Sequence, residues 1–262
     1  MSAAPNRLKA TFVTRPPVQI LPLAGLPEIR PGDDLARFIL GAVRMQDYQV
    51  AAGDVFVIAQ KIVSKAEGRI VSLDSIVPSS RAAKWAAEWG KDPRVIELVL
   101  RESKRIIRME RGVIVAETSH GFVCANAGID LSNADEGTAI LLPIDPDVSA
   151  FALQTRLGQA LGIDIGIIIS DTFGRPWREG LVNVALGVAG VAAIIDYRGE
   201  RDANGKLLQA TIIALADELA SAAELVMGKA DRVPVAIIRG VANTPPGSGR
   251  DLIRPEEKDL FR

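Results

Sequence analysis

The chain has 262 residues, of which 48% are hydrophobic and 5% aromatic, and its 31 basic and 32 acidic side chains give a formal net charge of −1. This balance argues against a general nucleic-acid-binding protein, which would carry a basic surplus or stripe. One cysteine, Cys124, and one histidine, His120, exclude an intrachain disulfide and any metal site built from several thiolates or imidazoles of one chain. A bound metal should therefore use carboxylates, hydroxyls and water, which suit magnesium or manganese.

Apolar runs in this sequence are too short or too interrupted for a membrane span, which needs about 18 apolar residues. The longest candidate, residues 184–195, is broken by Gly187 and Gly190. The N-terminus has no compact apolar run followed by a cleavage site. We therefore expect a cytoplasmic protein that does not enter a membrane.

The spacing of apolar residues predicts a mixture of strands and helices around an aliphatic core, and the length is sufficient to bury it. For residues 18–109 we expect a strand at 18–23, a helix that starts at Asp33 or Asp34, a strand at 55–59, and helices at 81–89 and 93–109. A hairpin at 113–125 and a strand at 139–143 should follow. The next element is a helix at 147–161, with Val148 and Phe151 expected to face inward. The remainder predicts strands at 165–169 and 184–197, a hairpin tip at 199–207, a helix at 214–227 and a strand at 233–238. No linker separates independent domains, so the composition fits one α/β or α+β unit.

Polar residues follow the buried strand 165–169 directly. Ser170, Asp171 and Thr172 come first, and the glycines and proline of residues 174–180 then predict a loop that also carries Arg175 and Arg178. Sheet proteins often place ligand-binding groups at the carboxyl ends of strands. Oxygen ligands beside two guanidinium groups suit a hard cation and an anionic substrate.

Two further segments leave strands with polar side chains. The strand at 55–59 is followed by an expected turn with Gln60, Lys61 and Lys65, which lacks the glycine spacing of a Walker loop. After the hairpin come Asp130, Ser132 and Asn133, which alone could also form an ordinary Asx-rich turn.

In combination these segments carry a family resemblance. The residues concerned are Ser64-Lys65-Ala-Glu-Gly-Arg69, Ala127-Gly-Ile-Asp130-Leu-Ser-Asn133 and Ser170-Asp171-Thr172-Phe-Gly-Arg-Pro-Trp-Arg-Glu-Gly180. Their order resembles the coenzyme F-420-0:L-glutamate ligase family, as do Leu26-Pro-Glu-Ile29 with Pro31-Gly-Asp-Asp34 and the helix at 216–228. The resemblance covers residues 18–254, which we treat as one catalytic unit between a lead-in at 1–17 and a charged tail at 255–262.

The resemblance implies an α+β fold of two intertwined lobes that forms a homodimer. It also implies a reaction in which GTP and Mg²⁺ or Mn²⁺, with K⁺ as a further candidate cation, drive formation of an amide between the lactyl carboxylate of F-420-0 and L-glutamate. An acyl phosphate would be the intermediate. The implied partners are these small molecules alone.

The family pattern also implies roles for individual residues. It assigns Asp130, Asp171 and Thr172 to the metal, and it assigns the nucleotide to Leu26, Pro27, Glu28, Ile29, Gln60, Lys65 and Asn133. Gln60 departs from the pattern, because a serine is common there. Lys229 departs too, since some relatives have an acidic metal ligand at that position. Arg175 and Arg178 are our own candidates for binding the substrate carboxylates or the acyl phosphate.

Two alternatives stay open from the sequence. One is another nucleotide-dependent carboxylate–amine ligase on the same scaffold, and the other is a non-catalytic deazaflavin- or nucleotide-binding protein. A deazaflavin-dependent oxidoreductase is disfavoured, because no Gly-x-Gly-x-x-Gly follows a strand.

Overall fold

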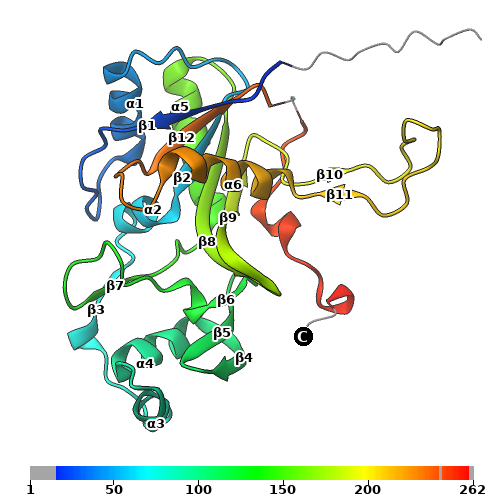
Figure 1. Cartoon of the computed structure of the whole chain (residues 1–262). Helices are drawn as coiled ribbons and strands as arrows, with labels where there is room; N and C mark the ends of the chain where they lie inside the picture. Colours follow the sequence, from blue (N-terminus) through cyan, green and yellow to red (C-terminus); the bar gives the residue numbers. More distant parts are fainter. Residues whose placement is uncertain (1–15, 242–243, 260–262) are drawn as a thin grey trace, which may run out of the picture.

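A five-stranded sheet forms the centre of the computed structural model, which describes residues 16–241 and 244–259. The strand order is β1-β12-β2-β8-β9, with β2 and β8 parallel and the other neighbouring pairs antiparallel (Figure 1). The strands are β1 (Gln19–Leu23), β12 (Val235–Arg239), β2 (Val55–Ala59), β8 (Gly166–Arg175) and β9 (Arg178–Ala189).

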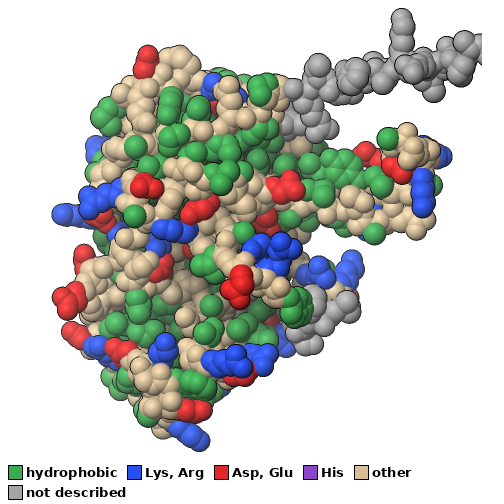
Figure 2. Space-filling model, viewed as in Figure 1, with side chains coloured by type: hydrophobic (Ala, Val, Ile, Leu, Met, Phe, Trp, Pro, Cys, Tyr) green, Lys and Arg blue, Asp and Glu red, His purple; other side chains and the backbone are tan. Residues whose placement is uncertain are grey.

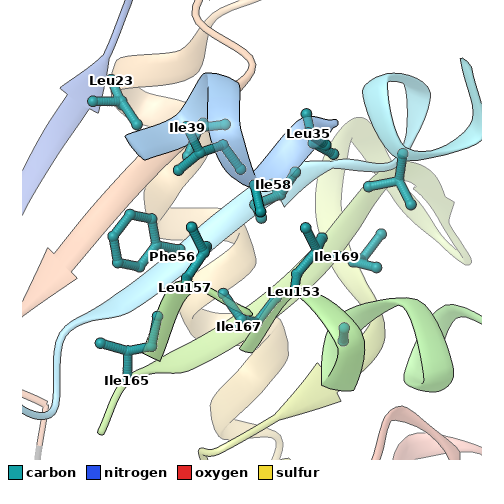
Figure 3. Close-up of a cluster of buried hydrophobic side chains, with 14 of the residues drawn as sticks. Leu23, Leu35, Ile39, Phe56, Ile58, Leu153, Leu157, Ile165, Ile167 and Ile169 are labelled. Carbon is teal, nitrogen blue, oxygen red and sulfur yellow. The ribbon is translucent and has the colours of Figure 1, made fainter. Parts of the chain in front are cut away.

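Both faces of this sheet are covered by helices, which explains why the inner strands are apolar over residues 55–59, 166–169 and 235–238. Helices α1 (Leu35–Met45) and α5 (Pro146–Leu161) cover one face, and α6 (Leu215–Met227) covers the other. Alternate residues of a strand point to opposite faces. Accordingly Phe56 and Ile167 pack in the cluster under α1 and α5, shown in Figure 3, whereas Ile168 packs toward α6.

A second lobe is inserted between β2 and α5, so the central sheet combines segments from both ends of the chain. The lobe has two helices, a two-stranded sheet and a three-stranded sheet, and Figure 1 places it below the central sheet. Its elements are β3 (Ile70–Ser72), α3 (Ser80–Trp89), α4 (Pro93–Glu102), β4 (Ser103–Glu110), β5 (Val113–Thr118), β6 (Val123–Ala125) and β7 (Thr138–Ile140). The fold is α+β, as predicted.

Short elements complete the chain. Helix α2 (Gln60–Ala66) connects the central sheet to the second lobe. The strands β10 (Ile195–Asp196) and β11 (Ile212–Ile213) pair at the base of an arm that projects from the body in Figure 1. The 3₁₀ helices are η1 (Leu73–Ser75), η2 (Asn126–Gly128), η3 (Gly249–Leu252) and η4 (Glu256–Lys258). Among the described residues, no helix combines the length and apolar character needed to cross a bilayer.

Several predicted elements differ from the structure. The helix expected at 93–109 ends at Glu102, because residues 103–110 pair with β5 as strand β4. The turn expected after Ala59 is the helix α2. The strand expected at 184–197 belongs to β9, which begins earlier and ends at Ala189. In α5, Val148 and Phe151 are 63% and 65% exposed rather than inward, since the helix turns a different face to the sheet.

The largest difference lies after Ser170, where a loop was expected. Strand β8 instead continues to Arg175 and forms a hairpin with β9, with a register shift at Gly174–Arg175. Trp177 and Gly180 have positive φ angles of 57° and 83°, so the residues that break regular structure shape the hairpin tip rather than a loop. Of the predicted terminal segments, residues 1–15 and 260–262 lie outside the described part of the chain.

Candidate active site

Strand β8 extends beyond the end of β2 toward the second lobe (Figure 1). Asp171 is the first residue of β8 after its pairing with β2. Its neighbour Ser170 pairs with Ala59, the last residue of the parallel strand β2. Because α2 begins directly after Ala59, this register brings Gln60 and Lys61 to the same edge as Asp171. The pairing of two strand ends thus assembles the site.

The Asp171 carboxyl has a strongly perturbed pKa of about 6. Burial raises the pKa first, and the negative charge of Asp130 raises it further. The backbone N–H of Thr172 and the ammonium groups of Lys61 and Lys229 act in the opposite direction without outweighing burial. A bound divalent cation would offset the electrostatic cost of placing two carboxylates together with one of them desolvated.

Asp130 approaches this site from the second lobe, where it forms a backbone bridge with Ile140 of β7. Its carboxylate lies 2.7 Å from Lys61 Nζ and accepts the backbone N–H of Ser132 at 2.6 Å. Burial raises the pKa of Asp130, but hydrogen bonds from Lys61 and Ser132 outweigh burial and lower it overall. Lys61 therefore holds Asp130 ionised beside Asp171.

Thr172 takes part in a closed set of hydrogen bonds. Its hydroxyl donates to Asn183 Oδ1 at 2.8 Å, across the β8–β9 pair that places the two residues opposite each other. The Asn183 amide donates to Glu224 Oε2 of α6 at 2.9 Å. Lys229 Nζ closes the ring with contacts to Thr172 Oγ1 at 2.6 Å and Glu224 Oε1 at 3.1 Å.

Several residues of the predicted nucleotide site line one cavity of about 310 Å³. The lining includes Glu28, Ile29, Lys65 and Ile140, and Ile140 is the backbone partner of Asp130. Lys65 Nζ lies 2.5 Å from Glu28 Oε1. The cavity therefore lies next to Asp130, and its lining contains the ammonium group of Lys65, which is paired with the largely exposed carboxylate of Glu28.

The remaining predicted nucleotide residues surround this cavity. Leu26 is half-buried and Pro27 exposed in the same segment as Glu28, and Asn133 is exposed beside the cavity residue Ala134. Gln60 is 1% exposed, and its Oε1 accepts the Ser64 hydroxyl at 2.8 Å. Its Nε2 has no hydrogen-bond partner among the described residues, which leaves a buried donor for a ligand.

Arg175 and Arg178 do not join this group. They face each other at the tip of the β8–β9 hairpin, where Arg175 donates to the backbone carbonyls of Glu179 and Gly180. At roughly 3.3 Å per strand residue, Arg175 lies about 13 Å along β8 from Asp171. A role with the carboxylates of a long substrate stays a prediction.

His120 and Cys124 are unsuited to catalysis as a base or nucleophile. His120 Nε2 donates to the backbone carbonyls of Pro143 and Ile144 at 2.9 and 3.0 Å, which gives the imidazole a structural role. Burial, with a smaller contribution from the Asp171 charge, raises the pKa of the Cys124 thiol to about 12. A neutral thiol is a poor nucleophile.

The donor atoms near Asp171 fit a hard cation that keeps part of its water shell. Two carboxylates and a hydroxyl are oxygen ligands of the kind that magnesium and manganese prefer. Within residues 16–241 and 244–259, no cluster of at least three histidine, cysteine or acidic side chains forms a complete protein cage. Water and phosphate oxygens would have to complete the shell, as is usual for magnesium.

Sequence reasoning assigned no function to Lys61, Asn183 or Glu224. Asn183 had a recognisable signal, because it is a single amide within the apolar run of residues 181–189 and is only 4% exposed. Lys61 and Glu224 had none, since lysine and glutamate are ordinary residues of helix surfaces.

Comparisons with known proteins agree with the sequence resemblance. The family model F420-0:Gamma-glutamyl ligase matches residues 25–240. A protein of Methanothermobacter thermautotrophicus named coenzyme F420:L-glutamate ligase is 50% identical over 249 residues, which are 94% of this chain and 99% of that protein. Proteins of the same name from Methanopyrus kandleri and Archaeoglobus fulgidus are 48% and 41% identical over 94% of this chain and 98% and 96% of their own lengths. The chain belongs to the F420-0:gamma-glutamyl ligase family.

Proposed function

We propose that the protein joins L-glutamate to the lactyl carboxylate of coenzyme F-420-0 as an amide, with cleavage of GTP to GDP and phosphate. The observation that carries this proposal is the desolvated Asp171 carboxylate beside Asp130, next to the cavity that contains Lys65. Family membership supports the choice of substrates. Because GTP is a nucleotide of the cell interior, we place the reaction in the cytoplasm.

The chemistry takes place in two steps. An oxygen of the F-420-0 carboxylate attacks the γ-phosphorus of GTP, GDP leaves, and an acyl phosphate forms. The amine of glutamate then attacks the acyl carbon, the bond between this carbon and the phosphate oxygen breaks so that phosphate leaves with that oxygen, and the amine loses a proton. Both steps bring anions together, so catalysis depends mainly on positioning and on neutralising charge.

The side chains have distinct roles in this proposal. Asp130 and Asp171 hold a divalent cation, with Thr172 as a third oxygen ligand through the lone pair that Lys229 leaves free. When bound, the cation neutralises phosphate charge and polarises the transferred group. Lys65 binds phosphate, and the unpaired Gln60 Nε2 donates to the nucleotide. Arg175 and Arg178 bind the outer carboxylates of F-420-0 or glutamate, and K⁺ is a further candidate cation.

A direct assay tests the proposal. Purified protein is mixed with F-420-0, L-glutamate, GTP and Mg²⁺ or Mn²⁺, and the products are analysed by mass spectrometry and by release of GDP. We expect GDP and a glutamyl-F-420 product only when all components are present. GDP release with another carboxylate and amine, but not with these, would favour a different ligase. Binding without turnover would favour the non-catalytic alternative.

Replacing Lys65 tests the nucleotide side of the site. We expect Lys65→Ala to raise the KM for GTP about tenfold, because a charge-assisted contact to phosphate is lost. Stability should change by less than about 1 kcal/mol, since the partner Glu28 is 74% exposed and is left in water. Steady-state GDP release and thermal unfolding measure the two effects. Lys65→Arg is the control that keeps the charge, and an unchanged KM for Lys65→Ala would contradict the assignment.

The arm at residues 194–213 supports a homodimer. Its strands β10 and β11 pair with each other, and Figure 2 shows hydrophobic side chains over the base of the arm. Leu207 and Ile212 are 48% and 44% exposed. Apolar side chains on a projecting arm are typical of a surface that a partner covers.

Charged substitutions on this arm test the dimer. We expect Leu207→Glu with Ile212→Glu to shift the mass measured by light scattering from dimer to monomer, because a buried carboxylate without a partner is strongly disfavoured. The control is Asn204→Glu, which adds one negative charge, half that of the double variant, at the turn of the tip. A wild-type chain that is already monomeric at micromolar concentration would refute the dimer.

A further inference from the structure

The ammonium group of Lys229 lies among oxygens of three different side chains. Its Nζ is 2.6 Å from Thr172 Oγ1, 3.1 Å from Glu224 Oε1 and 3.4 Å from Asn183 Oδ1. A hydroxyl, a carboxylate and an amide carbonyl are the oxygen ligands that hard metal ions also prefer. We call these three oxygens, from Thr172, Asn183 and Glu224, the oxygen nest.

Contacts other than those of Lys229 hold the nest in place. Asn183 is buried, donates through its amide to Glu224 and accepts the Thr172 hydroxyl. Its backbone carbonyl also accepts the hydroxyl of Ser221 from α6 at 2.7 Å. Removal of the Lys229 side chain, which is 62% exposed, should therefore leave the three oxygens where they are.

The backbone at the end of α6 directs Lys229 to this place. Gly228 ends the helix with φ 58°, and a Cβ atom there would lie 2.3 Å from Asp231 Oδ2. The next residue, Lys229, thus starts from a fixed turn, and its side chain reaches back to β8.

We propose that Lys229 provides a built-in cation of the active site, which occupies an oxygen nest that would otherwise bind a second metal ion. The protein then needs one divalent cation, at Asp130 and Asp171, and the ammonium supplies a further positive charge next to the anionic substrates. This inference rests on the proposed function, because it presumes that the carboxylate pair binds metal. A surface ion pair between Lys229 and Glu224 with no other role is the alternative.

Counting bound Mn²⁺ distinguishes these readings without relying on turnover. Free Mn²⁺ is measured by electron paramagnetic resonance in the absence of nucleotide, for the wild-type chain and for Lys229→Met. We expect about one Mn²⁺ per wild-type chain and about two per Lys229→Met chain, because the substitution leaves the nest with an uncompensated Glu224 carboxylate. Lys206→Met, on the arm, is the control for loss of one positive charge and should bind as the wild type does.

A double substitution tests whether the added ion uses the nest. In Lys229→Met with Glu224→Gln the nest keeps its shape but loses its negative charge, so binding should return to about one Mn²⁺. The proposal is overturned if Lys229→Met binds the same number as the wild type, or if the wild-type chain already binds two. A wild-type chain that binds none, with a Lys229→Met chain that binds one, supports the built-in cation and contradicts the metal at Asp171.

Discussion

Replacing Asp171 by asparagine is expected to abolish amide formation and to leave a folded protein whose metal-free form is more stable at neutral pH. Asparagine keeps the size and one carbonyl oxygen but removes the charge that holds a divalent cation. Without the cation, phosphate and carboxylate repel each other in a site partly shielded from water, where such terms are large. We expect a loss of at least about a hundredfold in GDP release, partly restored at high Mn²⁺.

The expected gain in stability follows from the raised pKa of Asp171. In the metal-free folded chain this pKa is about 6, against 3.8 for an ordinary aspartate. Between these values the folded state holds more protons than the unfolded state, so the free energy of unfolding falls as pH rises from about 4 to about 6. Above that window the charged carboxylate destabilises the fold by a constant amount, on the order of 2 kcal/mol.

Thermal unfolding in the presence of a chelator, from pH 4 to 8, measures this effect. The difference in melting temperature between Asp171→Asn and the wild type should be small at low pH and grow until about pH 6. Asp217→Asn is the matched control, because burial also raises the pKa of Asp217. Its Oδ1 accepts the Ala185 N–H at 2.8 Å, a contact that asparagine keeps.

The two aspartate variants should differ in metal dependence. Asp217→Asn should bind and use Mn²⁺ as the wild type does, whereas Asp171→Asn should require far more. An Asp171→Asn protein that is fully active at low Mn²⁺ would remove Asp171 from the metal site. If Asp171→Asn melts at a lower temperature than the wild type and keeps normal activity, Asp171 has a structural role in β8.

The central sheet could be predicted from the sequence because its inner strands contain continuous apolar runs at residues 55–59, 166–169 and 235–238. Such runs remain recognisable whatever their neighbours are. The segment 103–110 was assigned wrongly, since its mixture of charged and apolar residues, without strict alternation, fits a helix end as well as a strand. Only pairing with β5 decides between these, and that pairing is a tertiary contact.

Part of the candidate site could be predicted from the sequence for the same reason. Asp171 follows an evident apolar run, so a place just beyond the β2–β8 pairing could be expected from the sequence, although β8 itself continues to Arg175. Asn183 could not be assigned, because its place opposite Thr172 depends on the register of the β8–β9 hairpin. The sequence analysis predicted a loop at the tip of this hairpin, so no register was expected. Lys229 reaches Thr172 across 57 sequence positions, through the end of α6, and nothing local in either segment indicates that contact.

Gly187→Ala is expected to have the largest effect on stability of the glycine substitutions near the site. Gly187 lies in the edge strand β9, opposite Ile169 of β8, and faces Pro146 in the first turn of α5. A Cβ atom there would lie 2.1 Å from the carbonyl oxygen and 2.3 Å from the carbonyl carbon of Pro146. Both are backbone atoms, so no side-chain rotation can make room.

The first turn of α5 cannot easily move away from the sheet. Asp145 caps the helix through the N–H groups of Asp147 and Val148, and Asp147 Oδ1 accepts the N–H of Val188 in β9 at 2.9 Å. Separating α5 from β9 by the required distance would break these bonds. The same movement would disturb the β8–β9 register that sets Thr172 opposite Asn183.

We therefore expect Gly187→Ala to lower the free energy of unfolding by about 3 kcal/mol or more, and the melting temperature by about 10 °C. Gly41→Ala in α1 is the matched control: no atom lies within 4 Å of the added methyl group, and alanine should stabilise the helix by up to about 1 kcal/mol. Thermal unfolding of both variants gives the comparison, with the insoluble fraction recorded if Gly187→Ala fails to fold. A melting temperature equal to that of the wild type would contradict the close contact between the Pro146 carbonyl group of α5 and the backbone of Gly187 in β9. In that case the packing of α5 on β9 would not be what fixes the β8–β9 register that sets Thr172 opposite Asn183.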